Sequence, residues 1–301
     1  MENNMEKALH QYAKRSLATE TWIRFKSNRM AVVGLIVIIL LILISLSTLV
    51  IDFVTDKQIY DDYVIKQNLP EKLSKPSTEH IFGCDEYGRD ILLRILWGTR
   101  YSLFSGLLAV LFSVVIGGLL GATAGYYGGK VDNVIMRIMD VFLAVPNMVL
   151  AIAIVSVLGS SLFNILISIA IPYVPRYARV VRGSVMTVRD KEYIEAARAA
   201  GASNAAIIVK YLIPNSLSPI IVQASLGVAT AILHISGLSF LGIGIQPPTP
   251  EWGSILSSAR NYMRDGWHIS VIPGLMIVIT ILALNLLGDG LRDALDPKLK
   301  K

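Results

Sequence analysis

MAVVGLIVIILLILISLSTLVIDFV, the 25 residues from Met30 to Val54, decides the fold class of this 301-residue chain. The run contains a single charged side chain, Asp52, close to its end. About 20 consecutive apolar residues are enough for a helix to cross a bilayer. A lipid-exposed segment must satisfy its own backbone polar groups, and a helix does so. Residues 30–54 therefore predict a first transmembrane helix.

Five further apolar stretches follow the same pattern. All 28 basic residues of the chain lie outside the six stretches, as expected when a charge at the bilayer centre costs about 2.5–3.5 kcal/mol. Only 17% of the residues are charged, against about 25% in soluble domains. The sequence thus predicts an all-α polytopic membrane protein with six transmembrane helices. The five added stretches are 101–126, 139–159, 161–175, 214–245 and 268–290.

The distribution of basic residues predicts the orientation in the membrane. Nineteen of them lie in the segments on one side of the predicted spans, and nine lie in the segments on the other side. Cytoplasmic segments carry the excess of Lys and Arg, so both termini are expected in the cytoplasm and the chain in the cytoplasmic membrane. The net charge of +6 is spread over these segments and forms no nucleic-acid-binding patch. The inner set is 1–29, 127–138, 176–213 and 291–301; the outer set is 55–100 and 246–267.

Glycine and proline predict where helices pack and bend. Gly117, Gly121 and Gly125 share one face of the second stretch, where small residues let another helix approach closely. Pro146 and Pro273 are expected to kink their helices, because proline removes a backbone hydrogen bond. The fifth stretch is too long for one straight crossing. It is expected to break near its three C-terminal glycines, Gly237, Gly242 and Gly244.

Polar residues inside the apolar stretches are the candidates for a transport path. They are Asn147, Gln223, His234 and Asn285, and each either lines a path or forms an interhelical hydrogen bond. No second ligand accompanies His234, and the single cysteine, Cys84, has no cysteine or histidine spacing typical of zinc. No metal site is expected.

The sequence contains no complete motif of the common enzyme classes. AGYYGGKV, at 124–131, lacks the first glycine and the final Ser or Thr of a phosphate-binding loop. No nucleophile elbow or zinc-protease motif is present either. The chain is expected to be non-catalytic and to bind no cofactor itself.

The inner loop contains the most informative segment, EYIEAARAAGASNAAIIVKYLIPNSLSP, at 192–219. A helix over 195–200 should stop at Gly201, a second short helix should cover 203–211, and Pro214 should begin the fifth span. Small side chains on this protruding loop suit insertion into a partner's cleft. Four upstream arginines favour a helix that continues the fourth span and contacts anionic membrane lipid. They are Arg176, Arg179, Arg182 and Arg189.

This loop resembles the signature of ABC importer permeases. That signature has Glu-Ala-Ala, three residues, Gly, nine residues, then Ile-x-Leu-Pro. Glu195, Ala196, Ala197, Gly201 and Pro214 match it, while Tyr211 and Ile213 depart from its tail. Further segments are similar to the dipeptide/oligopeptide/nickel subfamily, and specifically to its C-type permease, the second permease of the operon. They are 22–34, 83–103, 125–129, 238–256 and 285–297.

The resemblance implies an assembly and a fold. Its partners would be a sister permease, two ATPase subunits that bind ATP and Mg, and an extracytoplasmic peptide-binding protein. The fold would be a type I importer domain with an extra N-terminal helix. The chain would then divide into the cytoplasmic segment 1–29, the helix 30–54, the extracytoplasmic segment 55–100, a five-helix core at 101–290 with a coupling loop at about 190–213, and the tail 291–301.

The function implied is the import of short peptides, driven by ATP hydrolysed in the partner subunits. Import of nickel or another small solute is the alternative. A histidine-rich path would favour metal, but the chain contains only four histidines, so peptides are favoured. An ATP-independent channel or carrier is disfavoured by the signature loop. The stretch QPPTPEW, at 246–252, is expected to form the outer mouth for the binding protein or to brace the fifth span against the sixth.

Overall fold

The computed structural model describes residues 17–295, which are mostly helical and contain no strand. The outermost parts of the two expected cytoplasmic end segments, 1–16 and 296–301, lie outside the described residues. The helices are α2 (Leu17–Ser27), α3 (Arg29–Val54), α4 (Ile91–Tyr127), α5 (Gly129–Leu143), α6 (Asn147–Leu158), α7 (Leu162–Val188), α8 (Glu192–Ala199), α9 (Asn204–Ala206), α10 (Ile213–Asn215), α11 (Leu217–Phe240), α12 (Trp252–Ala259) and α13 (Trp267–Leu295). Short 3₁₀ and π turns are η1 (Tyr60–Ile65), η2 (Leu69–Glu71), η3 (Ile207–Leu212) and η4 (Arg260–Tyr262).

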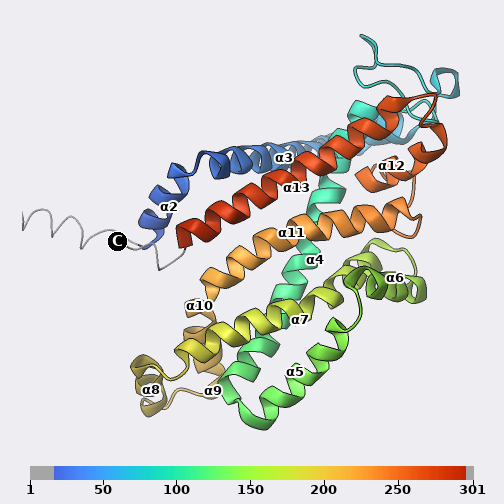
Figure 1. The fold of residues 1–301 in the computed structure, drawn as a ribbon. Coiled ribbons are helices and arrows are strands. Elements are labelled where there is room, and N and C mark those ends of the chain that lie inside the picture. Colours follow the sequence, from blue (N-terminus) through green and yellow to red (C-terminus); the bar gives the residue numbers. More distant parts are fainter. Residues whose placement is uncertain (1–16, 296–301) are drawn as a thin grey trace, which may run out of the picture.

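The long helices form an elongated bundle with distinct structures at its two ends (Figure 1). The short helices α8 and α9 lie at one end, towards which α2 and the last turns of α13 also point. The connection between α3 and α4, together with α12, lies at the opposite end. The all-α architecture expected from the sequence is confirmed.

Four of the helices, α3, α4, α11 and α13, are long and apolar enough to cross a membrane. They coincide with the first, second, fifth and sixth predicted spans. The prediction for the third span, one kinked helix over 139–159, is wrong, because the chain forms two helices there, α5 and α6, with an angle of 87° between them. Pro146 is the N-cap of α6 and does not interrupt a helix. Only taken together is the pair long and apolar enough, as a broken span or a re-entrant loop. The predicted fourth span is the first half of α7, which is not among the described helices that are apolar enough to cross a membrane on their own.

Capping side chains and glycine determine where several helices begin and end. Asp90 caps α4 by accepting a hydrogen bond from the Leu93 amide at 3.0 Å, and Ser161 caps α7 in the same way. The expected break of the fifth span lies at Leu241 and Gly242, the latter with φ +81°, where glycine is favoured. Gly237 lies inside α11 and does not break it. Pro273 lies inside α13, as expected.

The most extensive helix contact in the described bundle is that between α4 and α7. A Cβ atom added to Gly117 would lie 2.6 Å from the Val174 carbonyl oxygen, and one added to Gly121 would collide with the backbone of Ala178. One added to Gly125 would lie 3.0 Å from the Arg182 carbonyl oxygen. Contacts therefore recur every four residues on both helices, so the glycine face packs on another helix as predicted, and that helix is α7.

Glu251 joins helices at the α12 end of the bundle. This fully buried carboxylate caps α12 through the Gly253 and Ser254 amides, at 2.9 and 2.8 Å. It also accepts hydrogen bonds from Ser102 on α4 and Ser236 on α11, both at 3.2 Å. The segment QPPTPEW thus ends in a brace that joins α4 to α11, in addition to the packing of α12 on α13.

The glycine contact predicts opposite effects of one substitution at two neighbouring positions. Gly118→Ala places its Cβ in open space, so it should leave stability unchanged or raise it by about 0.5–1 kcal/mol through helix propensity. Gly121→Ala should destabilise the chain, by about 1–3 kcal/mol, because α4 and α7 must separate. Thermal unfolding of the purified chain in detergent measures both, and equal midpoints would refute the contact.

Candidate coupling loop and transport path

The candidate coupling loop is carried by the second half of α7. Beyond the predicted span end at residue 175, this helix continues to Val188, as the arginine pattern predicts. Arg182 binds Asp132 of α5, with Nη2 2.6 Å from Oδ2, and Arg179 binds Asp140 of the same helix. Arg189 donates to the Gly125 carbonyl oxygen at 2.8 Å. The helix that leads into the loop is thus attached to both α4 and α5.

Helix α8 sits on this support through two side chains. Ile194 is fully buried and Ala197 nearly so, whereas Glu195, Ala196 and Arg198 are exposed. Ile194 packs in a small apolar cluster contributed by the C-terminal parts of α4 and α7, by η3 and by the first turn of α11. One face of α8 therefore anchors the helix, and the face with Glu195 and Ala196 is free to meet another protein.

Gly201 closes α8 with a Schellman motif. Its amide donates to the Arg198 carbonyl oxygen at 3.0 Å, and the Ala202 amide donates to the Ala197 carbonyl oxygen at 3.0 Å. The φ angle of Gly201 is +81°, which favours glycine, and open space surrounds the position of a Cβ atom. Any intolerance of a side chain within this chain therefore comes from backbone strain and not from crowding.

After the turn, the chain returns to the bundle through α9, η3 and α10. The expected second helix is divided into an α turn, over Asn204–Ala206, and a π turn, over Ile207–Leu212. Tyr126 of α4 donates its hydroxyl hydrogen to Asn204 Oδ1 at 2.7 Å. Pro214 lies in α10, and the spanning helix α11 begins three residues later, at Leu217. The structure thus brings Glu195, Ala196, Ala197 and Gly201 together, with Pro214 at the return to the membrane.

Two of the four candidate path residues join α7 to α11. Gln223, with its amide oxygen turned towards Arg176, accepts hydrogen bonds from Nη2 and Nε at 2.7 and 2.8 Å. His234 Nδ1 lies 3.1 Å from the Tyr173 hydroxyl. Both contacts are interhelical, which is one of the two roles left open by the sequence. Sequence reasoning missed Tyr173, and it assigned Arg176 to contact with membrane lipid and not to Gln223.

The other two candidates lie elsewhere. Asn147 is in the first turn of α6, just after the bend, and Asn285 lies in the middle part of α13. Both are half-buried, and neither side chain hydrogen-bonds to another described residue. The four residues do not form one cluster.

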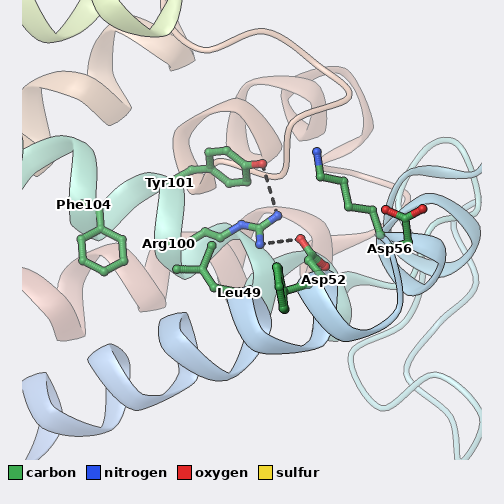
Figure 2. A pocket seen from close by; sticks show the side chains of 8 residues that line it. Leu49, Asp52, Asp56, Arg100, Tyr101 and Phe104 are labelled. Atoms are coloured by element: carbon green, nitrogen blue, oxygen red, sulfur yellow. Dashed lines mark hydrogen bonds and ion pairs between the residues drawn. The ribbon is translucent and has the colours of Figure 1, made fainter.

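A pocket of about 580 Å³ lies between the C-terminal end of α3 and the N-terminal part of α4 (Figure 2). Leu49, Phe53 and Phe104 form its apolar wall. Arg100 Nη1 binds Asp52 Oδ2 at 2.6 Å, and Trp97 donates to the other oxygen of Asp52 at 2.8 Å. The only acid of the first predicted span is therefore neutralised by α4 and fastens the N-terminal helix to the core.

Comparison with known proteins identifies the family. A family model described as the binding-protein-dependent transport system inner membrane component matches residues 117–301, which include the coupling loop. A second model, the N-terminal TM domain of oligopeptide transport permease C, matches residues 16–76. The chain belongs to the family of ABC importer permeases. Within it, the chain is a C-type member of the dipeptide/oligopeptide/nickel subfamily, a non-catalytic membrane subunit.

Relatives resemble this permease over nearly its whole length. The dipeptide transport system permease protein DppC of Alkalihalophilus pseudofirmus is 46% identical, over 96% of this chain and 93% of its own. The di/tripeptide permease DppC of Pseudomonas aeruginosa is 42% identical, over 93% and 92%. The glutathione permease GsiD of Pectobacterium atrosepticum is 44% identical, over 93% and 91%.

A solved structure supports the fold. The MetNI methionine ABC transporter, in an inward-facing conformation, contains a chain that aligns with a TM-score of 0.55. At 20% identity, the alignment covers 68% of the permease and 98% of that chain. The type I importer fold is therefore confirmed, with α3 as the additional N-terminal helix.

The anchoring of α8 can be tested by paired truncations. Ile194→Ala removes a fully buried side chain and should cost about 2–5 kcal/mol locally, loosening α8 from α7. Tyr193→Ala, next to it and exposed, should cost little. Amide hydrogen exchange of residues 192–202 should accelerate strongly in the first variant only. Equal exchange in both variants would show that α8 is not held by this cluster.

Proposed function

We propose that this permease translocates short peptides across the cytoplasmic membrane, using ATP hydrolysed by partner subunits. The observation that carries the proposal is the signature loop, presented on a helix whose free face contains Glu195 and Ala196. The peptide substrate is supported by the names of the relatives, which match 93–96% of the chain at 42–46% identity and are named for the transport of dipeptides, di- and tripeptides or glutathione.

The coupling step follows from how α8 is supported. When an ATPase cleft moves the exposed face of α8, Ile194 transmits the displacement to the inner ends of α4 and α7. The hydrogen bonds from α7 to Gln223 and His234 then carry it to α11. Glu195, Ala196, Ala197, Gly201 and Pro214 are proposed as the coupling residues. Asn147, Gln223, His234 and Asn285 stay candidates for contact with substrate or for helix packing.

The proposed assembly contains this chain, a sister permease, two ATPases that bind ATP and Mg, and an extracytoplasmic peptide-binding protein. Both termini are placed in the cytoplasm. The charge distribution supports this orientation, as does the position of α2 and of the end of α13 on the same side as α8 (Figure 1). Nickel import remains the second candidate within the subfamily, and His234 is the one histidine among the path candidates.

Gly201 provides the test of coupling. Gly201→Asp forces a side chain into a left-handed conformation, at about 1–2 kcal/mol, and adds bulk to the surface offered to the ATPase. Gly183→Asp is the matched control, because it adds the same side chain to α7 in open space with helical backbone. We expect Gly201→Asp to lower peptide uptake per ATP hydrolysed severalfold in reconstituted vesicles, with the control near wild type.

Two results would contradict the proposal. An unchanged ratio of uptake to hydrolysis in Gly201→Asp, with full co-purification of the ATPases, would remove the coupling role. Uptake of Ni²⁺ without uptake of di- or tripeptides by the wild-type assembly would replace the substrate. Glu195→Ala should have the smaller effect, since an exposed ion pair contributes at most about 1 kcal/mol.

Topology can be tested with introduced thiols. Cys84 lies in the segment placed outside, but its side chain is fully buried and is unsuited as a reporter. In a Cys84→Ser background, Lys66→Cys should react with an impermeant maleimide in intact cells, because residue 66 is exposed in the outer segment. Lys210→Cys should react only after permeabilisation. Labelling of Lys210→Cys in sealed cells would invert the orientation.

A further inference from the structure

Three potential metal ligands meet in the segment that precedes α4, although their spacing in the sequence did not reveal a site. Glu71, His80 and Cys84 each offer one ligand atom, and these atoms all lie within 4.8 Å of one another. Glu71 Oε2 is 3.1 Å from His80 Nε2. A carboxylate, an imidazole and a thiolate are the three donor types by which proteins hold Zn²⁺.

His80 is held in the orientation that a metal ligand requires. Its Nδ1 lies 2.7 Å from Asp90 Oδ2, while the other oxygen of Asp90 caps α4. A fixed carboxylate on Nδ1 selects the tautomer in which Nδ1 carries the hydrogen. Nε2 is then left as a lone-pair donor facing Glu71. Histidine ligands of zinc commonly have such a carboxylate behind them.

Cys84 points into this group from the protein interior. Its side chain is fully buried, it is a free thiol, and it makes no hydrogen bond to another described residue. A bound divalent metal deprotonates a coordinating thiol, so Cys84 can supply a thiolate to an ion held by Glu71 and His80.

A route from solvent reaches the same residues. A pocket of about 490 Å³ is lined by Glu71, His80 and Asp90, with the acidic side chains of Asp62 and Glu79 at its edge. A cation can therefore approach from the His80 and Glu71 side while the thiol stays buried.

We propose that Glu71, His80 and Cys84 form a Zn²⁺ site in the outer segment, with Asp90 as the residue that positions His80. On binding, the Cys84 thiol loses its proton to solvent and its sulfur bonds the metal. Neutral His80 binds through Nε2, Glu71 binds through one oxygen, and water takes the fourth position. The ion would fasten η2 and the loop around His80 to the residue pair Cys84–Asp90 at the start of α4.

The opposing interpretation is a metal-free hydrogen-bonded group. In that case a protonated His80 bridges Asp90 and Glu71, whose carboxylates raise its pKa, and Cys84 is an inert core residue. The metal site and the metal-free group differ in one respect that can be measured, namely whether the Cys84 sulfur bonds a divalent ion.

Cobalt titration of the purified full chain in detergent is the test, because Co²⁺ bound to thiolate gives a charge-transfer absorption. We expect one Co²⁺ per chain with this absorption, displaced by Zn²⁺, and a rise in the unfolding temperature on adding Zn²⁺. Cys84→Ser should abolish the absorption, and His80→Gln should weaken binding by more than tenfold. Asp90→Asn should weaken it by about 10–100-fold. Glu79→Gln, a nearby acid outside the ligand set, should bind as wild type.

The proposal is overturned if the folded wild-type chain shows no thiolate absorption with excess Co²⁺. It is equally overturned if binding is unchanged in Cys84→Ser and His80→Gln, since the ion would then be held elsewhere. A folding defect in a variant does not affect the test, because removal of Zn²⁺ from wild type by a chelator must itself lower the unfolding temperature. No lowering on chelation would also count against the site.

Discussion

The close approach of α4 and α7 is the contact on which the rest of the structure depends. Gly117, Gly121 and Gly125 bring the two backbones together every four residues. In a bilayer, apolar side chains gain little from meeting one another, so such close packing is a main source of helix association. It fixes the direction of α7, and through α7 it fixes where the coupling loop leaves the membrane. Without it, Arg189 could not reach the Gly125 carbonyl oxygen, and Ile194 would lose part of its cluster.

The two ends of the bundle are held by different chemistry. At the α12 end, two buried carboxylates have partners inside the chain: Glu251 caps α12, and Asp52 pairs with Arg100. At the α8 end, apolar contacts hold α8, while its opposite face is exposed. Between them, α5 and α6 bend sharply, and α7 meets α11 through polar contacts. Two well-packed ends, joined through the α5–α6 bend and the polar contacts between α7 and α11, fit a subunit that transmits motion from one end to a central path.

Periodicity and composition were enough to predict the helical membrane fold, the α4 glycine face, the extension of α7 and the turn at Gly201. Each of these depends on residues close together in the chain. A kink at Pro146 was predicted, but not that one helix ends there and a second begins at 87° to it, because apolar composition across 139–159 is the same for one helix or two. The Gln223–Arg176 and His234–Tyr173 contacts were missed since they join distant segments. The convergence of Glu71, His80 and Cys84 likewise depends on how the outer loop folds, and ligand spacing alone gave no sign of it.

The central claim is that α8, α7 and α4 move together as one body when the ATPases close. Distances between spin labels at Glu195→Cys on α8 and Tyr127→Cys at the end of α4 test it most directly, in a Cys84→Ser background. Both positions are exposed. The account predicts one unchanged distance distribution in the nucleotide-free and ATP-bound assembly, while the distance from α8 to the sister permease changes. A shift of the α8–α4 distance on ATP binding would contradict it, because the coupling helix would then move independently of the bundle.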